Sequence, residues 1–429
     1  MTTPTDLGPY PAFEGYDEAV SRDTCDPLQG YRDHFVITDP ELIYLDGNSL
    51  GRLPKSAVSM IETVLGDQWG DRLIRSWNEG WWDLQLRLGD QLAPLIGAGP
   101  SEVIVSDSTT VNLFKLAFAT LQAAPGGRDT IVTDDLNFPS DVYILDGVAR
   151  HLGGRLRIVE SDGVHGPLAD IAEAVDERTA LVSLSHTVFQ SGYTYDLSEV
   201  TRIAHEAGAM MLWDLSHSVG TIPIDVETSE VDLAVGCTYK YLNGGPGSPA
   251  FLYVRSQHQE RLGNPITGWW GHIAPFQFEL EFRPVTGIRR FHSGTMPILS
   301  LAAIEAGLDD VLAAGIDAIR AKSVGLTDYL VDQIQAHLEP LGFRLASPAD
   351  PLHRGSHVSV AHETAWPITL AMIERAKVIP DYRTPDNIRL GVAPLYTRFI
   401  DIHTAILRIH RIVESGAHHE FVGTTAQVT

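Results

Sequence analysis

Asp214 and Lys240 are the two residues whose types and positions point most directly to chemistry. Asp214 ends the apolar run 210–213, and Lys240 lies just before the glycine-rich segment 244–247. A lysine amine forms a Schiff base with the aldehyde of pyridoxal phosphate, and a carboxylate keeps the pyridine nitrogen protonated so that the ring accepts electrons. We therefore expect both side chains to contact one pyridoxal phosphate molecule.

Two further segments carry groups that such a ligand needs. Thr109 and Thr110 lie between a buried strand and a helix, where hydroxyls and free amides bind anions. Taken alone, this segment is more often an ordinary helix N-cap. Phe138 is suited to lie on an aromatic ring and Asp141 to hold a polar group of it, although Phe-Pro alone is more often a turn. The segment around Thr109 and Thr110 has no glycine pattern typical of dinucleotide or ATP binding.

The environments expected for Asp214 and Lys240 support this interpretation. A carboxylate at the end of an apolar strand is desolvated and needs a positive partner, which a pyridinium nitrogen supplies. A salt bridge or a helix cap is the alternative. A desolvated lysine has a lowered pKa and becomes nucleophilic. Each feature is weak alone, but together, at strand ends where one ligand can touch them all, they favour a pyridoxal phosphate enzyme.

Strands and helices alternate through most of the chain, which predicts an α/β fold with a mainly parallel sheet covered on both faces. Helical periodicity predicts helices after Pro54, over about 109–121, from Pro139, and over 298–312 and 324–338. Apolar runs predict strands at 103–105, 130–132, 180–184, 210–213 and 250–254.

Three parts are expected along the chain. Residues 1–53 form an N-terminal segment that contributes to the small domain and the active site, residues 54–300 a large cofactor-binding domain, and residues 301–429 a small α+β domain. The tail from Glu414 is expected to be frayed.

Composition limits the partners and the compartment. The formal charge is −24, from 31 Lys and Arg against 55 Asp and Glu, which argues against nucleic acid or an anionic membrane as partner. Cys25 and Cys237 cannot form a disulfide framework or a metal cluster. The first residues lack the pattern of a secretion signal, and no apolar run is long enough to span a membrane. We expect a cytoplasmic protein without a metal.

Five motifs stand out along the chain: Tyr-Leu-Asp-Gly-Asn-Ser-Leu-Gly at 44–51, Phe-Pro-Ser-Asp at 138–141, Trp-Asp-Leu-Ser-His at 213–217, Cys-Thr-Tyr-Lys-Tyr-Leu-Asn-Gly-Gly-Pro-Gly at 237–247 and Gly-Trp-Trp-Gly-His at 268–272. Together they resemble the kynureninase family, which belongs to fold type I of the pyridoxal phosphate enzymes. The similarity runs from about residue 40 to Arg398. It implies hydrolysis of L-kynurenine to anthranilate and L-alanine by a homodimer, within tryptophan catabolism or NAD biosynthesis.

The resemblance also assigns roles to individual residues. Lys240 is the Schiff-base lysine, Asp214 the partner of the ring nitrogen, and Tyr239 a phosphate ligand. Because the adjacent phosphate can exchange protons with its hydroxyl, we also expect Tyr239 to relay protons. The other cofactor residues are Phe138 on the ring, Thr109 and Thr110 at the phosphate, Asp141, Ser185 and His217 around the ring, and Trp269 and Thr295 from the neighbouring subunit. Arg389 binds the substrate carboxylate, and Ser49, Trp77 and His272 lie near the substrate's aromatic ring.

Some alternatives stay open at this point. Thr295 stands where some relatives carry Asn, so the preference between kynurenine and 3-hydroxykynurenine is undecided. An aminotransferase or racemase on an aromatic amino acid shares the cofactor contacts. A desulfurase is disfavoured because the latter part of the chain has no cysteine for a mobile loop, and a regulator because no basic appendage is present.

Overall fold

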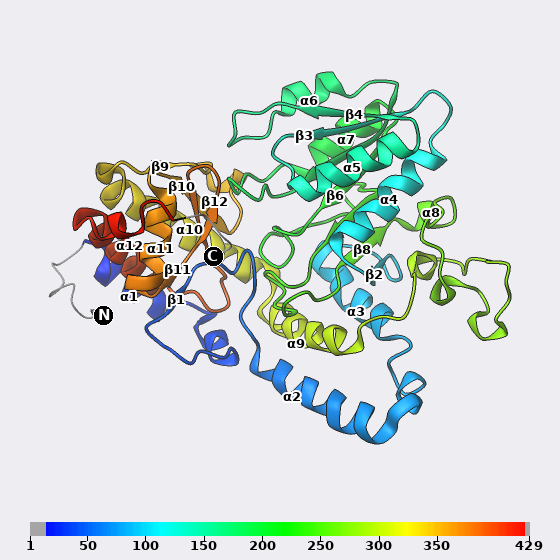
Figure 1. Ribbon diagram of the computed structural model, residues 1–429, viewed down its shortest axis with the longest axis horizontal. Coiled ribbons are helices and arrows are strands. Elements are labelled where there is room, and N and C mark those ends of the chain that lie inside the picture. Colours follow the sequence, from blue (N-terminus) through cyan, green and yellow to red (C-terminus); the bar gives the residue numbers. More distant parts are fainter. Residues whose placement is uncertain (1–13, 425–429) are drawn as a thin grey trace.

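The computed structural model describes residues 14–424, which form a larger and a smaller lobe (Figure 1). The central sheet of the larger lobe has seven strands, in the order β2-β8-β7-β6-β5-β3-β4. The strands are β2 (Val103–Val105), β3 (Thr130–Asp134), β4 (Arg155–Val159), β5 (Thr179–Ser185), β6 (Met210–Asp214), β7 (Leu233–Gly236) and β8 (Phe251–Val254). Only β8 runs antiparallel to its neighbours, β2 and β7. The predicted mainly parallel sheet is confirmed.

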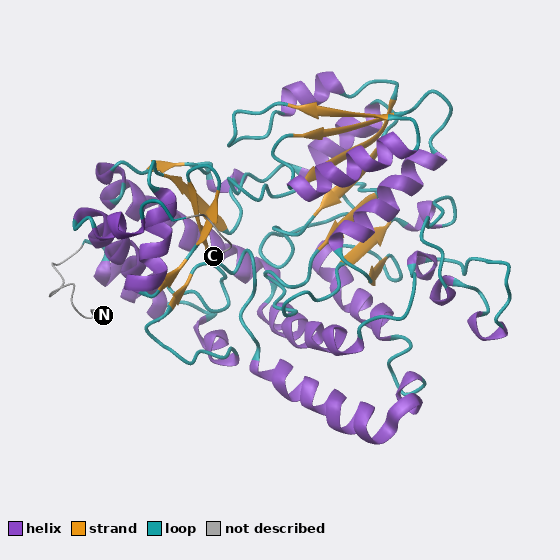
Figure 2. Ribbon diagram, viewed as in Figure 1, coloured by secondary structure: helices purple, strands orange, loops and turns teal. Residues whose placement is uncertain are grey.

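Helices cover both faces of this sheet (Figures 1 and 2). Successive strand residues enter different cores: Ile131 packs in one apolar cluster and Val132 in the other, as do Leu212 and Trp213. This alternation follows from the pleat, which points neighbouring side chains to opposite faces. The helices of this lobe are α2 (Lys55–Thr63), α3 (Leu84–Leu92), α4 (Thr109–Ala123), α5 (Pro139–His151), α6 (Leu168–Ala174), α7 (Leu197–Glu206), α8 (Ser256–Gln259) and α9 (Ile298–Ala314).

The smaller lobe holds a four-stranded antiparallel sheet in the order β12-β13-β10-β9. Its strands are β9 (Arg344–Leu345), β10 (His357–Ala361), β12 (Asp381–Arg383) and β13 (Asn387–Gly391), and its helices are α10 (Ile316–His337), α11 (Ala365–Ala376) and α12 (Phe399–Glu414). The N-terminal segment joins this lobe: α1 (Tyr16–Thr24) packs on α12, and β1 (Ile43–Tyr44) pairs with β11 (Val378–Ile379).

The expected division at residue 300 stays a prediction. The apolar core of the larger lobe takes in Leu301 and Leu308 from α9 and reaches Ile319 in α10. From Leu326 onward, the buried residues of the same helix pack in the core of the smaller lobe. The long helix α10 is therefore the structural connection between the two lobes.

The predicted helices are confirmed, and one expectation about the tail is wrong. Residues 417–421 form the 3-10 helix η10 (Ala417–Phe421), which packs on α11 and buries His418. Residues 425–429 lie outside the described part.

Further short helical turns are η1 (Gln29–His34), the π-helical η2 (Val64–Arg72), η3 (Leu73–Trp77), η4 (Ala93–Ile96), η5 (Trp269–Gly271), η6 (Pro275–Gln277), η7 (Ile288–Phe291), η8 (Glu339–Leu341) and η9 (Pro351–His353). Between residues 14 and 424, no helix combines the length and apolar character that crossing a membrane requires.

Candidate active site

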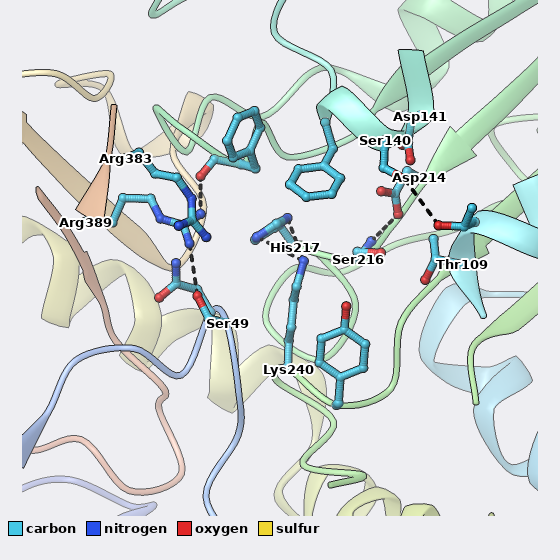
Figure 3. Close-up of a pocket in the computed structure, with 15 residues that line it drawn as sticks. Ser49, Thr109, Ser140, Asp141, Asp214, Ser216, His217, Lys240, Arg383 and Arg389 are labelled. Atoms are coloured by element: carbon cyan, nitrogen blue, oxygen red, sulfur yellow. Dashed lines mark hydrogen bonds between the residues drawn. The ribbon is translucent and has the colours of Figure 1, made fainter. Parts of the chain in front are cut away.

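A cavity of about 200 Å³ lies at the carboxyl ends of the parallel strands (Figure 3). Its lining residues are Asn48, Ser49, Thr109, Thr110, Phe138, Ser140, Asp141, Phe189, Asp214, Ser216, His217, Tyr239, Lys240, Arg383 and Arg389. Ten of the residues singled out from the sequence are therefore brought together. The strand ends of an open α/β sheet are the usual place for a ligand.

Two carboxyl groups meet at one end of the cavity. Asp214 ends β6, is 6% exposed and accepts a hydrogen bond of 2.8 Å from the backbone N–H of Ser216. Asp141 lies in the first turn of α5, and burial together with the neighbouring Asp214 raises the pKa of its carboxyl well above the usual range. Within residues 14–424, the contact found for the Asp214 carboxylate is with the backbone of Ser216 and not with a cationic side chain, and Asp141 Oδ2 meets no donor other than the Asp214 carboxyl group beside it. The pair needs a positive or hydrogen-donating partner.

Lys240 points into the middle of the cavity (Figure 3). Its Nζ lies 3.1 Å from Nε2 and 3.3 Å from Nδ1 of His217. Burial, and next the charge of Lys240, hold the pKa of His217 well below 6.5, so the imidazole is neutral. The N-terminal segment contacts the backbone next to Lys240, because the N–H of Gly51 donates to the carbonyl of Tyr239 at 2.8 Å. A Cβ at Gly51 would meet the carbonyl oxygen of Lys240 at 2.3 Å, so the close approach requires glycine.

Tyr239 borders the same space with its phenol. The neighbouring Cys237, then burial and Asp214, raise the pKa of Tyr239 above its ordinary value. Cys237 itself is buried, and burial raises the pKa of its thiol. Tyr239 therefore keeps its proton in this environment and can donate a hydrogen bond.

Hydroxyl groups gather at the N-terminus of the 15-residue helix α4. Ser108 is the N-cap and accepts from the N–H of Val111, so the ordinary capping interpretation is correct for this residue. Thr109 and Thr110 line the cavity beside it, and Thr110 Oγ1 lies 3.2 Å from Ser140 Oγ. A helix N-terminus with several hydroxyls is a site for a phosphate group.

Two arginines occupy the opposite end of the cavity. Arg389 of β13 is 1% exposed, donates to the carbonyl of Phe189 and to Ser49 Oγ (3.0 Å), and forms an ion pair with Asp381. Arg383 donates to the other oxygen of Asp381 at 2.8 Å. Burial lowers the pKa of Arg389 to about 10, so its guanidinium is still charged at neutral pH. This end of the cavity can bind a carboxylate.

The chemistry of these groups fits pyridoxal phosphate. The buried carboxyl pair lacks a cationic partner, which a protonated pyridine nitrogen would supply. A lysine amine lies within the same cavity, and a phosphate-type site lies at the start of α4. The neutral His217 next to Lys240 adds no competing charge.

Five predicted site residues lie outside the cavity. Ser185 ends β5 beside Asp214, but its hydroxyl donates to Asn137 Oδ1 at 2.6 Å. The other four are Thr295, which is exposed, and Trp77, Trp269 and His272. Trp77 and Trp269 belong to an aromatic cluster in which Trp82 stacks on Trp270 at 4.4 Å between ring centroids. The roles given to these five residues stay predictions.

The cavity also contains five residues that the sequence did not single out. They are Asn48, Ser140, Phe189, Ser216 and Arg383. Asn48, Ser140 and Ser216 lie within motifs already quoted, next to a chosen residue or two positions from one, so extending those motifs would have found them. Phe189 and Arg383 carry no local signal, because their position depends on how the lobes meet.

Comparisons with known proteins agree on one family of sequences and one fold. A sequence model of the kynureninase C-terminal domain matches residues 319–409. A protein named kynureninase from Burkholderia mallei (strain SAVP1) is 43% identical over 408 residues, covering 94% of this chain and 96% of the relative. The apo cysteine desulfurase from Thermococcus onnurineus NA1 has a TM-score of 0.78 at 19% identity, covering 90% of this chain and 98% of its own.

A second solved structure is a mutant of C-DES that has glycine covalently linked to its PLP cofactor. It has a TM-score of 0.76 at 19% identity, and the match covers 86% of this chain and 97% of the other. At this identity the two structures establish the fold alone. It is the fold type I architecture expected from the sequence.

Proposed function

This chain belongs to the kynureninase family, and on that premise we propose that it hydrolyses L-kynurenine to anthranilate and L-alanine, with pyridoxal 5'-phosphate as cofactor. The observation that carries the proposal is that Asp214 and Lys240 line one cavity whose far end holds Arg389. The reaction consumes one water and breaks the bond between the β- and γ-carbons of the substrate side chain.

The cofactor would be held at both of its ends. Thr109, Thr110 and the first N–H groups of α4 bind its phosphate, Phe138 packs on the ring, and Asp214 holds a proton on the ring nitrogen. When bound, pyridoxal phosphate supplies an electron sink for bonds at the substrate's α-carbon. His217 and Asp141 complete the polar surroundings of the ring.

Lys240 and Tyr239 move protons in this proposal. Lys240 would hold the cofactor through its amine and, once free, would take the proton from the substrate's α-carbon. Tyr239 keeps its proton in the substrate-free site and donates it during the later protonation that yields alanine. A positioned acid or base of this kind contributes about 10²- to 10⁴-fold to the rate.

The arginine end of the cavity sets the orientation of the substrate. Arg389 binds the α-carboxylate, and a planar guanidinium does this in a fixed geometry. Ser49 Oγ accepts from Arg389 at 3.0 Å and is proposed to lie near the substrate's aromatic ring. Trp77 and His272 are proposed to face the substrate's aromatic ring.

We further propose a homodimer in which each site uses residues of both subunits. Trp269 and Thr295 do not line the cavity of their own chain. Large apolar side chains are exposed on the projecting segment from α2 to η3: Val58, Leu65, Trp69, Leu73 and Ile74 are between 41% and 75% exposed. An exposed apolar surface of this kind supports contact with a second copy.

A complementation experiment tests the shared site. Lys240→Ala and Trp269→Ala variants are each expected to be inactive or nearly so. Mixing and reassociating them creates heterodimers in which one site has both residues intact, so activity returns. If each site lies within one chain, mixing restores nothing.

The nearest alternatives on this fold are a desulfurase and an aminotransferase. A desulfurase needs a thiol nucleophile. Cys237 is buried, Cys25 is exposed, and neither lines the cavity, so the described residues offer no such thiol. An aminotransferase would bind the same cofactor, and only the products separate it from the proposed reaction.

The place of action is proposed to be the cytoplasm, and the pathway the breakdown of tryptophan through kynurenine, with NAD biosynthesis as a further destination of the product. Both described cysteines are free, which supports a reducing compartment.

The proposed reaction is tested with purified protein loaded with pyridoxal phosphate. Addition of L-kynurenine should produce the fluorescence of anthranilate and an equal amount of L-alanine. Yellow protein that forms a keto acid instead would show an aminotransferase and contradict the proposal. Parallel assays with 3-hydroxy-L-kynurenine give the ratio of kcat/KM values, and hence the preferred substrate.

A further inference from the structure

Asn48 is the most unusual polar residue in the cavity. Its side chain is fully buried, and neither its Nδ2 nor its Oδ1 has a hydrogen-bond partner among residues 14–424. Leaving a buried amide without partners costs free energy, and such groups usually have a reason to exist. Because Asn48 also lines the cavity, a ligand in the cavity can provide the missing partner.

The strand that carries Arg389 fixes the position of this amide. Gly391 lies two residues after Arg389 on β13, so both positions face the same side of the sheet. A Cβ built at Gly391 would come within 1.7 Å of Asn48 Oδ1. The amide of Asn48 therefore occupies the space that a side chain at residue 391 would take, directly beside Arg389.

The turn that carries Asn48 is tied to the same strand. The N–H of Gly391 donates to the carbonyl of Leu45 at 2.7 Å, and Asp46 forms an isolated bridge with Gly391. Ser49, the next residue, accepts from Arg389 Nη2 at 3.0 Å. Asn48 and Arg389 are thus held in one rigid unit that faces the cavity.

We propose that Asn48 is a second ligand of the substrate's α-carboxylate, acting together with Arg389. The amide Nδ2 donates to one carboxylate oxygen while the guanidinium binds the other, so two fixed groups set the rotation of the substrate about its α-carbon. This inference rests on the proposed function only in assuming an amino acid substrate. The oxygen of the amide lies nearest to Gly391, which leaves the nitrogen for the ligand.

The local charge suits an anion at this point. Arg389 and Arg383 are both near, and one carboxyl group, Asp381, is paired with the two of them. Asp46 is the other acid close by, and burial raises the pKa of its carboxyl. A carboxylate ligand therefore meets two guanidinium groups at this end of the cavity, to which a neutral amide adds a further donor.

The test measures binding of L-alanine, the amino acid product, to protein loaded with pyridoxal phosphate, by titrating its visible absorbance. Asn48→Ala should weaken L-alanine binding about 10- to 100-fold, the range expected for a hydrogen bond to a charged group. Binding of ethylamine, which is L-alanine without its carboxylate, should be unchanged. Gln85→Ala is the matched control, because Gln85 is a fully buried amide on α3 with no described partner and lies outside the cavity.

A second variant guards against a purely structural effect. Gly391→Ala should weaken L-alanine binding by displacing the amide, and the same change in the Asn48→Ala background should have little further effect. Unchanged L-alanine binding in Asn48→Ala would overturn the proposal, as would equal weakening of ethylamine binding. If the wild-type protein binds L-alanine and Asn48→Ala weakens it, the inference holds even where no anthranilate is formed from kynurenine. A wild-type protein that does not bind L-alanine overturns it.

Discussion

Asp381 lies directly opposite Arg389 in the register of β12 and β13, and the two side chains form a buried ion pair. The same carboxyl group receives hydrogen bonds from Arg383 at 2.8 Å and from Ser49 at 3.2 Å. One acid therefore fixes two arginines and a serine at the end of the cavity where the substrate carboxylate is expected.

Replacing Asp381 by Asn should loosen Arg389 without removing it. We expect the KM for L-kynurenine to rise about 10- to 100-fold, because a charge-assisted contact that orients the guanidinium is lost. The kcat should change less, and the visible absorbance of the bound cofactor should stay the same. Steady-state kinetics together with an absorbance spectrum measure all three quantities.

Asp39→Asn is the control for this variant. Asp39 pairs with Lys377 at 3.0 Å on the surface, outside the cavity, and its loss should leave KM unchanged. A KM for Asp381→Asn that equals the wild-type value, or falls below it, would show that Asp381 does not position Arg389.

Tyr239→Phe should slow turnover about 100-fold or more while the cofactor absorbance stays intact, because a positioned proton donor is removed and the cofactor's other contacts are kept. Tyr241→Phe is the matched control: its hydroxyl donates to the carbonyl of Ser356 and does not line the cavity. Turnover is measured by anthranilate fluorescence. Loss of the absorbance in Tyr239→Phe would mean that this residue chiefly holds the cofactor.

The buried pair of Asp134 and Tyr195 should make stability depend on pH. Burial raises the pKa of Asp134 to about 6, from 3.8 in an unfolded chain, and Tyr195 donates a hydrogen bond to its carboxyl. The Asp134 carboxyl therefore binds its proton more tightly in the folded state than in the unfolded state. The stabilisation that comes from this protonation is complete below pH 3.8 and is lost as the pH rises to about 6.

Asp134→Asn removes this titration. Between pH 4 and pH 6, the free energy of unfolding of the wild-type protein should fall relative to that of the variant, by at most roughly 3 kcal/mol. Urea unfolding of both proteins at several pH values measures the difference. A difference that is constant or increases with pH would show that Asp134 is ionised in the folded protein throughout this range.

Local patterns predicted the framework of the site well. The start of α4 at Thr109 and of α5 at Pro139, and the end of β6 at Asp214, follow from apolar periodicity and from helix-starting residues, which act over a few positions. Eight of the ten predicted site residues in the cavity meet there because parallel strands end at the same edge of the sheet, whereas Ser49 and Arg389 come from the N-terminal turn and the small sheet.

Contacts between distant segments could not be read in the same way. The contact of Asn48 with Gly391 and the pairing of Asp381 with Arg389 depend on the register of the small sheet and on how the N-terminal turn docks against it. The apolar face of the segment with Leu65 and Trp69 predicted a helix, but not that these side chains would be exposed. The tail near His418 carries no periodic pattern, yet it packs on α11.

The measurement that tests the central claim most directly is chemical fixation of the cofactor. Protein loaded with pyridoxal phosphate is treated with borohydride, digested and examined by mass spectrometry. The account predicts that the peptide containing Lys240 carries the added mass of the reduced cofactor and that Lys240→Ala carries none. Label on a different lysine of the wild-type protein, or no label at all, would contradict it.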